Sequence, residues 1–212
     1  MPAFDLRGIK VARYTLSKNK EAVYSEKTSV GDAMNVNLSW RFAEGRLYAE
    51  SSLAEYMRKC TGGTISIGVK YLPLDAQKLM YGDKEKTRTI SYTPASTGQG
   101  SAQPTTKQIK SQVTGGVSLP SYVGTSFYAP DMIDGVQKFT AVFVSRSLFG
   151  KPDMVFQTAG ENIVFNTPTT TGEFLNNGTK DQDMVEVAIL DSEEEAIAWT
   201  DLVLTSPEQT SG

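Results

Sequence analysis

Residues 34–71, with the sequence MNVNLSWRFAEGRLYAESSLAEYMRKCTGGTISIGVKY, contain the pattern that decides the fold. Apolar and polar side chains alternate at both ends of this stretch, with apolar residues at Met34, Val36, Leu38 and Trp40 and again at Ile65, Ile67, Val69 and Tyr71. A period of two is typical of strands that bury one face. The stretch therefore predicts two β-strands separated by a long connection.

The connection itself has the pattern of a helix. Ser52 and Glu55 have the spacing of a capping box, in which two side chains satisfy backbone amides at the start of a helix. Apolar residues follow at helical spacing, at Leu53, Tyr56, Met57 and Cys60. Gly62 is placed to end such a helix. A short amphipathic helix is therefore expected between the two strands.

Weaker strand patterns continue in both directions from this stretch. Further strands are expected at residues 9–14, 46–50, 122–128, 139–146, 163–165 and 184–190. Pro73 and Gly82 favour a helix between them, and Ser192 with Glu195 favours a capped helix running towards Val203. Because the connections look short, the sheets should be antiparallel. The sequence predicts a mostly β fold with two or three short helices, as a single domain over residues 1–212.

Residues 93–116 interrupt the alternation. Eighteen of these 24 positions are Gly, Pro, Ser, Thr or Gln, and only Ile109 and Val113 are sizeable aliphatic residues. Such a segment cannot build its own core. It is expected to be a flexible loop or arm, either mobile or laid across a neighbouring molecule. Residues 205–212 are expected to form a C-terminal tail.

The composition removes most catalytic chemistry. The chain has no histidine and a single cysteine, Cys60, so it cannot form an internal disulfide or the usual zinc, copper and iron ligand sets. No imidazole is present to act as an acid or base. We assign no catalytic residue, cofactor or metal site and expect the chain not to be an enzyme. A glycosidase remains as an alternative, because its two carboxylates need no histidine.

Charge is distributed unevenly along the chain. Residues 181–212 hold nine Asp and Glu and no Lys or Arg, so that residues 1–180 carry a net charge of +6 within the overall −3. These two regions should attract each other. No stretch approaches the roughly 20 apolar residues that cross a bilayer, and no signal-peptide pattern is present. We therefore expect no membrane association and synthesis in a cytoplasm.

The order of the segments resembles the major tail proteins, or tail tube proteins, of long-tailed bacteriophages. The first part of the likeness lies in residues 37–73, with the sequence NLSWRFAEGRLYAESSLAEYMRKCTGGTISIGVKYLP. The second part lies in residues 126–174, with the sequence SFYAPDMIDGVQKFTAVFVSRSLFGKPDMVFQTAGENIVFNTPTTTGEF. Within it, the short stretches FGKP, QT and FNTP follow one another in the order expected for this family. EEEAIAWTDLVLTSPE at 193–208 closes the chain in a similar way.

The resemblance implies a β-sandwich or barrel of the tail tube type. Six copies would form a ring, and the rings would stack into the hollow tube through which phage DNA leaves. The implied partners are further copies of the chain, the tape measure and tail terminator proteins, and DNA that passes the lumen non-specifically. The implied location is the virion, after assembly in the host cytoplasm. Pairing of strand edges around a closed ring would protect them from aggregation.

The resemblance also implies a role for the connection between the first two strands. In such proteins this position makes contacts between rings, which here would involve Arg46, Tyr48, Glu50, Leu53, Tyr56 and Met57. Two other readings remain open. The chain could be another β-rich virion component, such as a tail completion or capsid decoration protein. It could also be a β-sandwich module that binds or hydrolyses carbohydrate.

Overall fold

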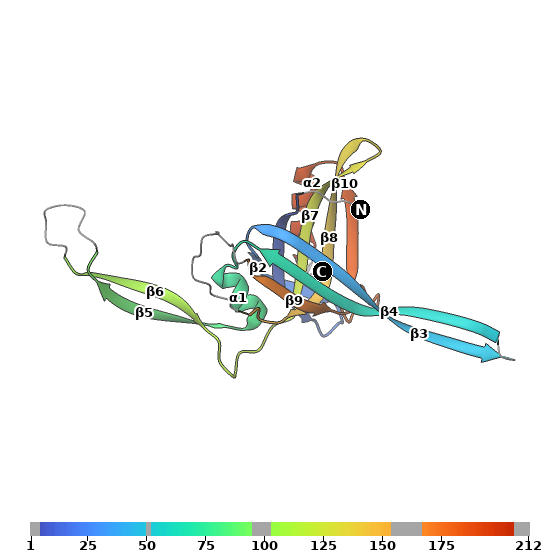
Figure 1. The fold of residues 1–212 in the computed structure, drawn as a ribbon, viewed down its shortest axis with the longest axis horizontal. Coiled ribbons are helices and arrows are strands. Elements are labelled where there is room, and N and C mark those ends of the chain that lie inside the picture. Colours follow the sequence, from blue (N-terminus) through green and yellow to red (C-terminus); the bar gives the residue numbers. More distant parts are fainter. Residues whose placement is uncertain (1–4, 50–51, 95–102, 154–166, 206–212) are drawn as a thin grey trace, which may run out of the picture.

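The computed structural model describes residues 5–49, 52–94, 103–153 and 167–205 (Figure 1). The elements in these ranges are, in chain order, β1 (Arg7–Leu16), β2 (Ala22–Ser29), β3 (Ala33–Ala49), β4 (Ser52–Val69), α1 (Leu74–Tyr81), β5 (Lys84–Tyr92), β6 (Thr105–Val113), β7 (Val123–Ile133), β8 (Val136–Phe149), β9 (Thr169–Phe174), β10 (Val185–Leu190) and α2 (Glu193–Leu202). The strand pairs in the described residues are antiparallel. The mostly β, antiparallel fold expected from the sequence is confirmed.

One eight-stranded sheet forms the body of the molecule. Its strands are hydrogen-bonded in the order β2-β1-β7-β8-β9-β4-β3, and β10 also pairs with β8. The last residues of β8, 147–149, pair with β9, whereas residues 139–144 pair with β10. Strand β8 therefore belongs to two layers, one made with β2, β1, β7 and β10 and one made with β9, β4 and β3, whose strands cross in Figure 1.

The core lies between these two layers. It is built from fully buried side chains of both, among them Ile9, Val11, Ile65, Ile67, Val144, Phe149 and Phe174. Helix α1 covers one side of this core with Ala76, Leu79 and Met80. The alternation that predicted the strand through Ile65 and Ile67 therefore reflects one buried face, as expected.

The helix predicted from Ser52 is absent, and that prediction is wrong. Residues 52–69 form the single strand β4, paired with β3 from Ala33 opposite Val69 to Ala49 opposite Ser52. A run of cross-strand backbone hydrogen bonds outweighs a capping pattern worth about 1 kcal/mol. Gly62, expected to end the helix, lies instead at an irregularity in the strand pairing, with a positive φ of 128°.

Most of the other predicted elements are confirmed. Strands β1, β7, β8 and β10 lie at the expected positions, and residues 46–49 continue β3. Glu50 and residues 163–165 lie outside the described ranges. Helix α1 begins after Pro73 and ends at Gly82, whose φ is 69°. Helix α2 begins with the predicted capping box of Ser192 and Glu195.

The segment predicted to be a flexible loop or arm, residues 93–116, contains a strand that the sequence analysis did not predict. Residues 105–113 form β6, which pairs along its whole length with β5 in a separate two-stranded sheet. The Thr-rich composition suits a strand as well as a loop. As expected, the segment has no core of its own, because no residue of β5 or β6 is buried. The stretch 95–102 between these strands and most of the predicted tail, 206–212, lie outside the described residues.

The acidic C-terminal region is held against the basic part of the chain, as expected. Arg7 Nη1 lies 2.9 Å from Glu193 Oε1. Asp201 Oδ1 forms ion pairs with Lys10 Nζ at 2.9 Å and with Lys27 Nζ at 2.7 Å. These pairs join α2 to β1 and β2 across the face of the sheet that α2 covers. Neither helix in the described residues is long and apolar enough to cross a membrane.

Candidate functional site

Two hairpins project from opposite sides of the body (Figure 1). The first arm consists of residues 42–49 of β3 and 52–60 of β4. The second arm consists of β5 and β6. Long projections of this kind expose backbone and side chains that a monomer has no need to display. We therefore treat both arms as candidate contact surfaces.

A bulge marks the root of the first arm. Arg41 pairs with Gly62 and Phe42 with Cys60, so that Thr61 is an extra residue on β4. Two residues further along β4, Gly63 is packed so closely against β3 that an added Cβ would be 2.0 Å from the Ser39 carbonyl oxygen. The chain therefore needs glycine here to pass from the packed half of the hairpin to the projecting half.

One face of the first arm carries a ladder of charged and aromatic side chains. Glu44 lies between two arginines, with Arg46 Nη2 at 3.4 Å and Arg58 Nε at 3.6 Å from its carboxylate oxygens. The guanidinium carbon of Arg58 is 3.8 Å from the centre of the Phe42 ring, and that of Arg46 is 5.7 Å from the centre of the Tyr56 ring. A hydrogen bond to Glu44 raises the pKa of the Tyr56 phenol.

The opposite face of the first arm carries two large apolar side chains together with the charged Glu55 and Lys59. Leu47 is 59% exposed and Met57 is 65% exposed. Gly45 pairs directly with Met57 and lies two residues before Leu47 on β3, and an added Cβ there would meet nothing within 4 Å. Two large apolar side chains on an unfilled ribbon face are suited to contact with another surface.

The structure brings together only some of the residues that the resemblance implied. Arg46 and Tyr56 are directly paired, and Met57 lies on the opposite face. The helix that would have placed Tyr56 and Met57 on one stripe does not exist. Tyr48 and Leu53 pair by backbone register, and their side chains are outside the described parts, as is Glu50.

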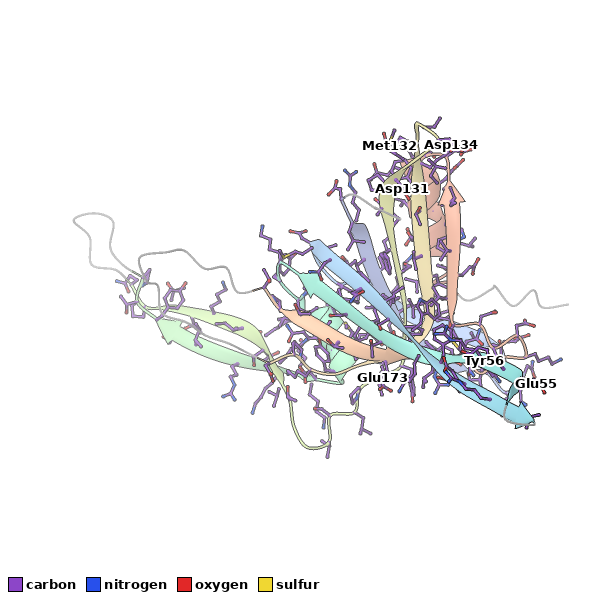
Figure 2. The ribbon with its side chains drawn as sticks, turned by 45° about the vertical axis from the view of Figure 1, so that its right-hand side comes forward. Glu55, Tyr56, Asp131, Met132, Asp134 and Glu173 are labelled. Carbon is purple, nitrogen blue, oxygen red and sulfur yellow. The ribbon has the colours of Figure 1, made fainter. Side chains whose placement is uncertain are left out.

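Several residues of the first arm escaped the sequence analysis. They are Phe42, Glu44, Leu47 and Arg58. An alternation of period two continues from Trp40 through Phe42, and extending the first predicted strand along it would have reached Phe42, Glu44 and Leu47. Arg58 lies on β4, in the stretch predicted to be a helix. Figure 2 shows Glu55 and Tyr56 towards the free end of this arm, away from the body.

The second arm is anchored to the body at its base. Asp83, whose side chain is fully buried, accepts hydrogen bonds from Lys151 Nζ at 2.7 Å and Thr114 Oγ1 at 2.7 Å. Gln112 also donates to the Leu74 carbonyl oxygen. Asp83 directly precedes β5 and Thr114 directly follows β6, so this buried cluster fixes where both strands leave the body.

The sheet of the body has open edges. Among the described strands, β2 pairs only with β1, and β10 pairs only with β8. These are the two edges of one layer. On β10, Val187 is 55% exposed and Ile189 is 53% exposed. An unpaired edge with exposed aliphatic side chains is a template for another strand.

Two clefts in the described residues each contain a single carboxylate, whereas a glycosidase site needs two. A cleft of about 370 Å³ between β3 and the β7–β8 pair contains Asp5 as its only carboxylate. In a second cleft, of about 470 Å³, Asp32 is the only carboxylate among the lining residues. Asp131 and Asp134 lie apart from both, at the end of the β7–β8 hairpin (Figure 2). Within the described ranges, no three metal-binding side chains gather.

Comparison with models of known protein families and with curated proteins finds no match to this chain.

Proposed function

We propose that this protein is a structural subunit that assembles with its own copies into hexameric rings, which stack into the hollow tail tube of a bacteriophage. The observation that carries the proposal is the first arm, a projecting hairpin that exposes the large apolar side chains of Leu47 and Met57 on one face. The ring, the number six and the phage tail come from the resemblance in sequence. The arm supports assembly in general.

The energetics of the arm favour assembly. Complete burial of a Leu or Met side chain contributes about 1.5–3 kcal/mol. One such contact is too weak for a stable pair of molecules, but six copies in a ring make the contact six times at once. The opposite face of the arm, with its arginines bound to Glu44, keeps the ribbon polar on the side away from the apolar contact.

The open edges of the body support ring closure. Strands β2 and β10 lie at opposite edges of the same layer. Pairing β2 of one copy with β10 of the next therefore gives a contact that repeats head to tail. Such a heterologous contact generates a closed ring when the rotation closes. Closure would satisfy the free backbone groups of β10 and bury Val187 and Ile189.

The charge of the chain suits a passage for DNA. A protein that neutralises phosphates with Lys or Arg gains affinity for DNA and would retard its movement. With a net charge of −3, the chain offers little such attraction overall. The tape measure and tail terminator proteins and the passing DNA are the partners of this proposed function.

Negative-stain electron microscopy of the purified protein tests the proposal. We expect hollow tubes or stacked rings of the unmodified chain. A chain that stays monomeric at high concentration would exclude the proposal, and a chain that binds only to another tail or capsid protein would point to a completion or decoration role.

A double variant tests the first arm itself. Leu47→Asp with Met57→Asp should permit rings but prevent their stacking, with an unchanged circular dichroism spectrum. The matched control is Val117→Asp with Leu119→Asp, which changes two side chains of 72% and 79% exposure outside the arm. Normal tubes from the arm variant would contradict the proposed contact.

A further inference from the structure

The second arm carries a face whose positive charge is not balanced. The register of β5 and β6 places six of its basic and aliphatic residues on one face, namely Lys84, Lys86, Arg88, Ile90, Lys107 and Ile109. We call this the basic face. In the described part of the chain, none of its four cations has a carboxylate partner. The opposite face is neutral by comparison, because Lys110 pairs with Glu85 at 2.9 Å.

Cations and aliphatic side chains are interleaved on the basic face. Arg88 lies opposite Ile109, and Ile90 lies opposite Lys107, so that each cation at the centre of the ribbon has an isoleucine beside it. Ile90 and Ile109 are 39% and 38% exposed. A surface of this kind fits a partner that combines carboxylates with apolar side chains.

The outer side of α2 has the complementary composition. Helix α2 contains four acidic residues and no basic one. Glu194 of α2 and Glu186 of β10 have no side-chain partner in the described residues. Glu186 lies on the face of the sheet that α2 covers. Ile197 and Leu202 are 40% and 68% exposed on this helix. Glu186, Glu194, Ile197 and Leu202 form what we call the α2 surface.

The two surfaces cannot meet within one molecule. The second arm projects away from the body beside α1, whereas α2 lies across the sheet from it (Figure 1). A nine-residue hairpin extends about 30 Å, compared with a diameter of roughly 40 Å for a compact domain of this size. The arm is therefore long enough to lie over much of one face of a neighbouring copy.

We propose that the basic face of the second arm binds the α2 surface of a second copy of this chain. The inference rests on the proposed function, since it requires self-assembly, and it assigns a contact which that function leaves open. A nucleic acid is the other anionic partner to consider. The isoleucines between the cations have no use against a phosphate backbone, and Tyr92 is the only aromatic residue of the described arm available for base stacking.

Cross-linking between copies tests the contact directly. With Cys60 replaced by Ser, the chain has no thiol, so single cysteines can be introduced at chosen positions. Differently tagged Ile109→Cys and Ile197→Cys proteins are mixed, assembled and treated with a short bis-maleimide. We expect a cross-linked species that contains both tags. The matched control is Gln108→Cys, the neighbouring exposed residue on the opposite face of β6, which should give much less product.

Charge reversal tests the energetics. Lys86→Glu with Arg88→Glu should raise the protein concentration needed for half-assembly about tenfold, as should Glu186→Lys with Glu194→Lys. A chain with all four changes should assemble like the unmodified protein. Lys18→Glu with Lys70→Glu changes the net charge equally at exposed sites outside both surfaces and should leave assembly unchanged.

The outcomes separate this inference from the proposed function. If the unmodified chain assembles, but the Ile109–Ile197 cross-link fails to form and the four changes fail to restore assembly, the arm contact is wrong and the proposed function stands. If the unmodified chain never assembles, both fail. If the arm reversal leaves assembly intact and abolishes binding to duplex DNA in fluorescence anisotropy, the basic face is a nucleic-acid surface and our assignment is overturned.

Discussion

Arg46 and Tyr56 face each other across the first arm, with the guanidinium carbon 5.7 Å from the centre of the phenol ring. Both also interact with Glu44, through an ion pair and a hydrogen bond respectively. The three side chains belong to two strands, so together they tie the arm across its width. Exposed contacts of this kind are individually weak, and their effect is best seen in the titration of the groups involved.

The phenol of Tyr56 should titrate at a higher pH than an ordinary tyrosine. The hydrogen bond to Glu44 is the largest cause of its raised pKa. Glu44→Gln removes the carboxylate and should lower the Tyr56 pKa towards 10, the unperturbed value. NMR titration of labelled tyrosine rings measures the change. Glu55→Gln, which removes a carboxylate from the other face of the arm, is the control; an equal effect of both variants would contradict the assignment.

The docking of α2 should weaken in acid. Hydrogen bonds from Arg7, and then from Tyr128, lower the pKa of Glu193 below its usual 4.5. A carboxylate whose pKa is depressed in the folded state stabilises the fold above its unfolded pKa, and this contribution disappears as the pH falls through the folded value. The free energy of unfolding should therefore decrease below about pH 4.5. Urea unfolding at several pH values measures it.

A matched pair of variants isolates the contribution of Glu193. Glu193→Gln should reduce the acid dependence of the free energy of unfolding, because this side chain no longer titrates, while Asp201, whose pKa is also lowered, still contributes. Glu194→Gln removes the neighbouring carboxylate, which has no partner in the described residues, and should leave that dependence as it is. Identical profiles for the two variants would show that the Arg7 contact does not stabilise the fold.

The buried ion pair at the base of the second arm should be costly to break. Lys151→Met leaves the fully buried Asp83 carboxylate without its cation and should destabilise the protein by about 3–5 kcal/mol. Adding Asp83→Asn should recover much of this loss. Lys138→Met, which breaks a pair with the exposed Asp191, should cost at most about 1 kcal/mol in the same urea experiment. Similar losses for Lys151→Met and Lys138→Met would contradict this account.

Two glycines of β3 and β4 should respond differently to alanine. At Gly63 the new Cβ would lie 2.0 Å from the Ser39 carbonyl oxygen and 2.6 Å from the Phe174 ring, so Gly63→Ala should cost about 1–3 kcal/mol or more. At Gly45 the space is open, and Gly45→Ala should change stability by less than about 0.5 kcal/mol. Thermal unfolding distinguishes them, and equal melting temperatures would show that the root of the arm is not tightly packed.

The sequence predicted the elements whose signals are local. Gly82 ends α1 because glycine adopts a positive φ without strain, and Ser192 with Glu195 begins α2 through its own hydrogen bonds. Ile65 and Ile67 were recognisable because one face of β4 is buried. In each case the chemistry that forms the element lies within a few residues of the chain.

The projecting hairpins were not predictable in this way. Leu53, Tyr56 and Met57 fit a helical spacing as well as a strand, and only the pairing of β4 with β3 decides between them. Residues 105–113 show no buried face, so hydrophobic periodicity gives no signal for β6. A two-stranded ribbon in solvent is specified by its partner strand and by its anchor at Asp83, and neither can be read from a local window.

The shared strand β8 has a mechanical consequence. Force applied to the first arm passes along β4, across its backbone pairs with β9 and into the end of β8, which continues into the other layer. Along this path the hydrogen bonds lie across the direction of pull, so that many must break together before the layers slide. The body should therefore resist tension along the first arm better than an unzipping force on the edge strand β10, whose bonds to β8 can break one after another.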